Sequence, residues 1–282
     1  MLACGLCFVC LTGIVRYIGT DLPAAQQAFL RFAFGVPLLV PALVRMARDG
    51  MPAGAWRLFG ARGVVHVIAV IFWFYAMARL PVAEVTAIGY LNPVVVMLGA
   101  VLVFGERLSR ARVICVIVAL CGAVVVLRPG VREITDGHLA QVAAACFFAG
   151  SYLFAKRLSG LVSAGLVVSM LSVSATIGLL PLALWVWQPI TGAQAGLLAG
   201  TAVLGTAAHY CMTRAFAAAP LAVTQPVTFL QIVWATLLGA LVFGEPVDLY
   251  VLSGAAMIIG AISISTWTEW RGRREAALLP EA

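Results

Sequence analysis

Three polar side chains at intervals of three residues interrupt an apolar stretch in the C-terminal part of the chain. Gln225, Thr228 and Gln231 share one face of a helix at this spacing. Polar groups are costly in an apolar environment, so each needs a hydrogen-bonding partner. We expect this face to bind a polar, uncharged edge of a ligand. Hydrogen bonding between neighbouring helices is the alternative.

A single arginine, Arg31, lies about two turns inside another apolar stretch. An arginine at the centre of a membrane span costs roughly 2.5–3.5 kcal/mol on insertion scales. Its guanidinium should therefore face the interior of a helix bundle. We expect Arg31 to clamp an anionic or carbonyl group of a ligand. Snorkelling to the membrane surface, or tethering of a neighbouring helix, is the alternative.

Further candidates combine rings with hydrogen-bonding groups on other apolar stretches. Rings that face a cavity can stack on a planar ligand, although aromatic residues at helical spacing more often pack in a core. An imidazole can bind ligand or accept a proton near neutral pH. We predict Pro93 to kink its helix, because proline frees a backbone carbonyl one turn earlier. The candidate binding residues are Trp73, Tyr90, Asn92, Gln141, Tyr152 and His209.

Metal binding and catalysis are not expected. Cys4, Cys7 and Cys10 have the spacing of a ligand set, but the residues between them are apolar or glycine, which favours packing within a helix. The sequence has no H-E-x-x-H or G-x-S-x-G motif and no pair of Asp residues inside an apolar stretch. We therefore expect no metal, no cofactor and no enzymatic activity, which makes an intramembrane enzyme an unfavoured alternative.

The composition places these candidates in a membrane. The chain is 63% hydrophobic and 10% charged, with a mean hydropathy of +1.06, whereas soluble domains carry about 25% charged residues. Continuous apolar runs without strict alternation predict helices rather than a barrel. We predict ten membrane spans: Leu2–Ile18, Gln26–Val44, Arg62–Ala78, Val82–Phe104, Ala111–Leu127, Leu139–Leu158, Gly165–Trp187, Gly196–Ala215, Ala222–Phe243 and Leu249–Trp267.

Arginine and lysine residues concentrate in alternate connectors, which predicts the orientation of the chain. Arg45, Arg48, Arg57 and Arg62 are assigned to the second connector, and the segment 269–282 is assigned as a basic tail. Both termini are therefore expected on the cytoplasmic side of the cytoplasmic (inner) membrane. The net charge of +7 mostly reflects this asymmetry, and nothing supports binding of nucleic acid.

The two halves of the chain resemble each other. Ala76–Glu106 and Ala215–Glu245 follow one pattern at a constant offset, so that Pro81 corresponds to Pro220 and Glu106 to Glu245. Residues 1–130 and 137–268 would each hold five helices, and an odd number inverts the second copy. The predicted fold is an all-α integral membrane protein with ten transmembrane helices in two inverted five-helix repeats, typical of secondary transporters. Glu106 and Glu245 are expected to act as gates or clasps on opposite faces.

Several local motifs resemble the drug/metabolite transporter superfamily, EamA type. They are Phe29-Leu30-Arg31-Phe32 and a Gly-Glu pair after the fourth and the ninth span. The stretches 16–23 and 229–236 are similar to a branch with riboflavin and S-adenosylmethionine carriers. The resemblance implies alternating-access transport of a small organic metabolite, with riboflavin or a similar polar aromatic compound as the best candidate.

Other functions and partners stay open at this point. The alternatives are export of amino acids or drug-like compounds, and a channel. No carboxylate is expected at the centre of a span, which favours facilitated diffusion or exchange over proton coupling. The expected partners are a small-molecule substrate and the lipid bilayer. The small residues 143–145 and 254–256 would permit a homodimer.

Overall fold

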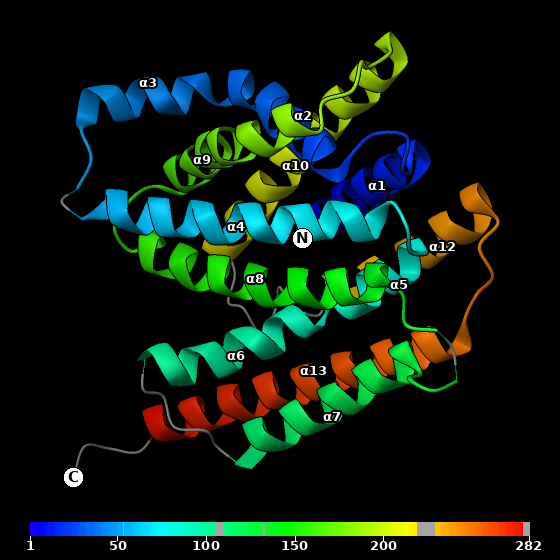
Figure 1. Ribbon diagram of the computed structural model, residues 1–282. Coiled ribbons are helices and arrows are strands. Elements are labelled where there is room, and N and C mark those ends of the chain that lie inside the picture. Colours follow the sequence, from blue (N-terminus) through cyan, green and yellow to red (C-terminus); the bar gives the residue numbers. More distant parts are fainter. Residues whose placement is uncertain (53, 105–109, 132, 219–228, 279–282) are drawn as a thin grey trace.

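A computed structural model describes residues 1–52, 54–104, 110–131, 133–218 and 229–278, and these form helices without a β-strand (Figure 1). By length and composition, five described helices can cross a membrane within the bounds of α4, α8, α9, α10 and α13. Shorter helices complete the bundle. The long helices are α4 (Ala55–Met77), α8 (Asp136–Ser159), α9 (Ala164–Trp185), α10 (Gly192–Ala218) and α13 (Leu249–Leu278); the shorter ones include α1 (Leu2–Ile18), α7 (Arg110–Leu127) and α12 (Gln231–Phe243).

The outer surface of the bundle is apolar. Trp185 at the end of α9 is 90% exposed, and Leu241 on α12 is 81% exposed. Exposed apolar surface of this kind is unfavourable in water but not against lipid tails. The helices and their surface therefore describe a multi-pass membrane protein, as the composition predicts.

The second predicted span, Gln26–Val44, is divided in the structure. It consists of α2 (Ala24–Gly35), a 3-10 turn η1 (Val36–Leu39) and α3 (Val40–Asp49). Pro37 and Pro41 lie in the first turns of η1 and α3. Each proline lacks the N–H that would continue the preceding helix, which explains why the helical path is interrupted here.

The fourth predicted span is interrupted near its middle. Helix α5 (Val82–Gly89) ends one residue before Tyr90, and α6 (Leu91–Phe104) begins directly after it. Pro93 has no N–H to bond to the carbonyl of Gly89, four residues earlier, so the hydrogen-bond ladder is incomplete at this point. The break places Tyr90 at a joint between two helical segments.

The helices pack in pairs that join the two halves of the chain. Helix α4 lies along α8, α1 along α10, and α7 along α13 (Figure 1). The α7–α13 contact is very close, because a Cβ atom on Gly254 would lie 2.5 Å from the carbonyl oxygen of Gly122. Small residues allow such an approach of two helix backbones. Helix α2 packs against α9, α10 and α4, which surrounds Arg31 with helices from both halves.

Candidate functional site

Arg31 is buried in α2 and is only 4% exposed. Its Cζ atom lies 4.1 Å from the centre of the Phe32 ring, a cation–π contact. Its guanidinium rests on the backbone of α10 at Gly205, where a Cβ atom would lie 2.3 Å from Nη2. The Nε atom is buried without a hydrogen-bond partner, and no ion pair with Arg31 occurs among the described residues. Arg31 therefore faces the bundle interior, as expected, and holds its charge without an acidic partner.

A small cavity lies beside this guanidinium, between α2, α9 and α10. The space that the centre of a water molecule can occupy in it is about 10 Å³, and its polar lining is formed by Arg31, Ser172, Thr206 and His209. A space of this size holds about one water molecule. Entry of a metabolite at this point would therefore require the surrounding helices to separate.

Seven rings in mutual contact, two of which line the cavity, form what we call the aromatic cluster. Its members come from α1, α2, α4, α8 and α10: Phe8, Phe32, His66, Trp73, Phe148, Tyr152 and His209.

Neighbouring rings of the cluster are in edge-to-face contact, except for Phe148 and Tyr152, which stack. The centroid of Phe8 lies 6.1 Å from Trp73 and 5.4 Å from His209. Phe148 lies 5.7 Å from Trp73 and stacks on Tyr152 at 6.4 Å. Two members, Phe32 and His209, also line the cavity beside Arg31. A surface of rings therefore continues from a buried positive charge, which suits a planar molecule with an anionic or carbonyl group.

Two residues of this site lie deeper in the helix bundle than the sequence predicted. His66 lies one turn from the start of the predicted span Arg62–Ala78, a position near the membrane surface. In the structure it is 2% exposed, its Nδ1 lies 3.1 Å from Ser151 Oγ, and its ring contacts Phe32 and Phe148. Arg62 was assigned to a connector. Because α4 begins at Ala55 rather than at residue 62, Arg62 lies two turns inside the helix. A prediction that allowed a longer span here would have started the helix before Arg62 and placed this residue inside it.

Three predicted binding residues make hydrogen bonds between helices. The hydroxyl of Tyr90 donates to the carbonyl of Phe229 at 3.2 Å. The side-chain amide of Asn92 donates to the carbonyl of Ala145 at 3.2 Å, and that of Gln141 to the carbonyl of Val85 at 2.9 Å. These contacts correspond to the helix-tethering alternative for such residues. A ligand contact at Tyr90, Asn92 or Gln141 stays a prediction.

The polar face predicted around Gln231 is described only in part. Gln231 begins α12, is half-buried and faces α1, because a Cβ atom on Gly5 would lie 3.8 Å from the Cβ of Gln231. Gln225, Thr228 and Glu106 lie outside the described residues.

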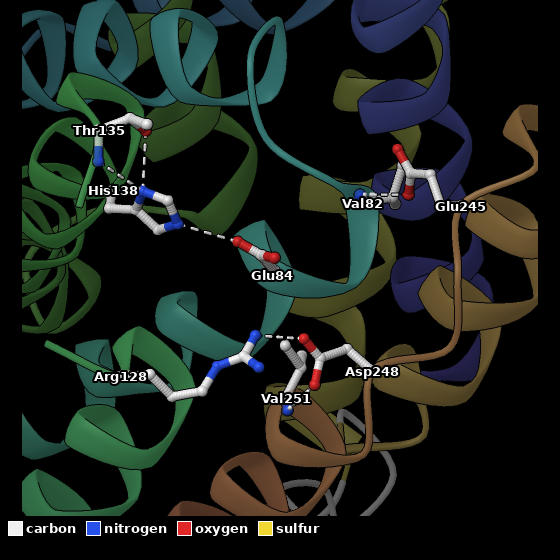
Figure 2. A network of polar contacts seen from close by, with 8 residues as sticks. All are labelled: Val82, Glu84, Arg128, Thr135, His138, Glu245, Asp248 and Val251. Atoms are coloured by element: carbon white, nitrogen blue, oxygen red, sulfur yellow. Dashed lines mark hydrogen bonds and ion pairs between the residues drawn. The ribbon is translucent and has the colours of Figure 1, made fainter. Parts of the chain in front are cut away.

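Glu245 joins three helices at one end of the bundle (Figure 2). Gly244 ends α12 with a φ of 63°, a left-handed turn that favours glycine and sets the direction of the next residue. One carboxylate oxygen of Glu245 pairs with Arg16 Nε at 3.1 Å, and the other accepts from the backbone N–H of Val82 at 2.9 Å. The contact links the end of α1, the start of α5 and the end of α12.

Two further groups of polar contacts, around His138 and around Asp248, lie at the same end (Figure 2). The backbone N–H of Thr135 donates to His138 Nδ1 at 3.1 Å, so the neutral imidazole carries its proton on Nε2 and donates to Glu84 Oε2 at 3.0 Å. Asp248 accepts from the first backbone N–H groups of α13 and pairs with Arg128. We call this region, with the Glu245 contacts, the clasp end.

Comparison with known proteins places the chain in a family. Residues 1–128 and 135–267 match the EamA-like transporter family. A riboflavin transporter of Rhizobium johnstonii is 30% identical, over 98% of this chain and 93% of the relative. The pseudopaline exporter CntI of Pseudomonas aeruginosa strain UCBPP-PA14 is 26% identical, over 90% of each chain.

A solved crystal structure shares the fold, with a TM-score of 0.60 and 18% identity over 95% of this chain and 98% of its own. The matches confirm the EamA-type resemblance predicted from Arg31 and the Gly-Glu pairs, and they point to transport rather than catalysis. The chain belongs to the EamA-like transporter family.

Proposed function

We propose that this protein is a secondary transporter that moves a small organic metabolite across the cytoplasmic membrane by alternating access. The best candidate is riboflavin or a similar polar aromatic metabolite. The observation that carries this proposal is the buried guanidinium of Arg31 beside the aromatic cluster. The rings would stack on the planar part of the metabolite, while Arg31 would bind its carbonyl or anionic group. The similarity to a riboflavin transporter supports this choice of substrate.

The proposed architecture is ten transmembrane helices in two inverted repeats, residues 1–130 and 137–268, followed by a cytoplasmic tail at 269–282. The packing of the described helices supports it. If α8 corresponds to α1 and α10 to α4, the contact of α4 with α8 corresponds to that of α10 with α1. The contact of α7 with α13 would then join equivalent helices. With both termini in the cytoplasm, the clasp end would face outward.

In this arrangement Glu245 would close the outer side of the transporter. Its carboxylate belongs to the second repeat, and its partners Arg16 and Val82 belong to the first. Opening toward the outside would separate the repeats and break both contacts. Glu106 would have the corresponding role on the cytoplasmic side. We propose that transport proceeds by facilitated diffusion or exchange rather than by proton coupling. Formation of a homodimer stays a prediction.

Transport is testable with purified protein in phosphatidylcholine vesicles, using the fluorescence of riboflavin to follow its uptake. We expect saturable uptake. Trp73→Ala should raise the half-saturation concentration by about three- to ten-fold, because an aromatic pair contributes roughly 0.5–1.5 kcal/mol and Trp73 contacts two other rings of the cluster. Trp56→Ala is the matched control, since Trp56 lies on the same helix and is 57% exposed. Absence of saturable uptake, or equal effects of the two substitutions, would contradict the proposal.

Export of amino acids or drug-like compounds is the second candidate function. It is supported by the similarity to a pseudopaline exporter. Counterflow distinguishes the two functions when separate vesicles are preloaded with riboflavin or with a labelled amino acid. Riboflavin outside should accelerate release of preloaded riboflavin if it is a substrate. Exchange of the amino acid, without release of riboflavin in either case, would favour the second function.

A further inference from the structure

Arg62 is a second buried arginine with an incomplete set of partners. It is 5% exposed, and its Nη1 donates to the carbonyl of Val167 on α9 at 3.1 Å. Its Nε is buried without a hydrogen-bond partner. A guanidinium carries five N–H donors and stays charged inside proteins. A single backbone carbonyl satisfies one donor and supplies no negative charge.

Arg62 and Arg31 meet the same segment of α9. The carbonyl of Val167 accepts the hydrogen bond of Arg62, and the next residue, Val168, lines the cavity beside Arg31. The ring of Phe32, which the Arg31 guanidinium faces, also contacts His66, and His66 follows Arg62 by one turn of α4. Both guanidinium groups therefore lie in the same part of the bundle, between α2, α4, α9 and α10.

No carboxylate among the described residues pairs with either arginine. The arginine–carboxylate pairs of the described residues are both at the clasp end, Arg16 with Glu245 and Arg128 with Asp248. Burial of a charge without an acidic partner is unfavourable, and protein interiors normally avoid it by pairing. Two such charges at one site are explained if the negative charge arrives with the transported molecule.

We propose that Arg31 and Arg62 together bind an oxyanion of the substrate, a carboxylate or a phosphate, while the planar part of the substrate packs in the aromatic cluster. Arginine suits this task because its forked donors match the geometry of both groups. The inference rests on the proposed transport function and narrows the substrate to ring-bearing metabolites that carry an oxyanion. A neutral flavin would then be a weaker ligand than an anionic one.

Riboflavin and riboflavin 5′-phosphate form a matched pair of probes, because they differ only in one phosphate group. Their affinities for the full-length protein in phosphatidylcholine nanodiscs can be measured by quenching of flavin fluorescence. We expect the phosphate form to bind about ten-fold more tightly or better, as charge-assisted hydrogen bonds imply. Arg62→Gln and Arg31→Gln should each abolish this preference. Arg57→Gln should preserve it, because Arg57 is an exposed residue of the same helix as Arg62.

Equal affinities for the two flavins, or a preference that survives Arg62→Gln, would overturn the inference. If Arg62→Gln does not fold, Arg62→Lys replaces it, because lysine keeps the charge but not the forked geometry. The preference should then fall by at least about three-fold, consistent with loss of part of a charge-assisted contact. An unchanged preference in Arg62→Lys would contradict a role of this guanidinium.

Inorganic phosphate tests the oxyanion site independently of the flavin proposal. If neither flavin binds, the proposed substrate is wrong, but phosphate at constant ionic strength should still raise the melting temperature of the wild type and not that of Arg62→Gln. Absence of this shift would overturn the inference. Nanodiscs of phosphatidylglycerol distinguish a lipid source, because a headgroup bound at the site would abolish the preference for the phosphate form and overturn the assignment to substrate.

Discussion

The contact between Gly205 and Arg31 leads to a prediction that separates function from stability. In Gly205→Ala the new Cβ atom would lie 2.3 Å from Nη2 of Arg31 and 2.8 Å from its Cζ and Nε. Favourable contacts between heavy atoms begin near 3.5 Å, so the guanidinium must move by about 1 Å. The atoms that must move belong to the end of a side chain, not to a backbone, so α10 itself can stay in place.

The expected effect on ligand affinity follows from this displacement. A hydrogen bond to a charged group contributes roughly 1.5–3 kcal/mol, so misplacing the Arg31 donors should weaken binding by about 10- to 100-fold. The effect on folding has the opposite sign, because alanine is more favourable than glycine in a helix by about 0.8–1.0 kcal/mol. The variant should therefore fold with an unchanged or slightly raised melting temperature and bind riboflavin, or its phosphate, poorly.

Affinity by flavin fluorescence and melting temperature by thermal denaturation, both on purified protein, test these expectations together. Gly200→Ala is the control, because it lies on the same helix and its Cβ would make an ordinary contact of 3.7 Å with Ile14. Wild-type affinity in Gly205→Ala would refute the assignment of Arg31 to the binding site. Loss of folded protein would show that the guanidinium cannot move, which would refute the reasoning about its surroundings.

The clasp end and the α7–α13 contact give three further predictions. Glu245→Gln removes the ion pair with Arg16, and we expect faster labelling of a cysteine introduced near this end by a membrane-impermeant reagent; an unchanged labelling rate would argue against a clasp. Asp248→Ala should lower the stability of the protein to denaturation by about 1 kcal/mol through loss of the α13 cap, with Asp248→Asn retaining most of it. Gly254→Ala should disrupt the packing of α7 on α13, because its Cβ would lie 2.5 Å from the carbonyl oxygen of Gly122. We expect aggregated rather than monodisperse protein on size-exclusion chromatography, and normal elution would contradict this packing.

Local sequence signals predicted much of the helical pattern. The first helix is Leu2–Ile18, as predicted, because Gly19 follows it with a φ of 61° and ends the helix. The prolines explain the breaks after Gly35 and at Tyr90, although the prediction treated Gln26–Val44 as one span. Such breaks depend on whether a bilayer and neighbouring helices tolerate the missing hydrogen bonds, which local sequence does not determine.

The candidate site was less accessible from sequence. Arg31, Trp73, Tyr152 and His209 were predicted as candidates, because a polar or aromatic residue in an apolar run is visible locally, and their contacts with a ligand stay a prediction. The position of Arg62 depends on Val167, which lies 105 residues away, and the pairing of Arg16 with Glu245 spans 229 residues. Contacts of this kind are set by how the helices pack, so neither residue type nor helical spacing reveals them.

The burial of Arg31 has a consequence for how the protein is made. Helix α2 carries Gln26, Gln27 and Arg31, so the free energy of inserting it alone from the translocon into the bilayer is unfavourable. The guanidinium packs against Gly205, which the ribosome synthesises much later than α2. We therefore expect α2 to reach its final position only after α10 has been synthesised, which would couple the assembly of the two halves.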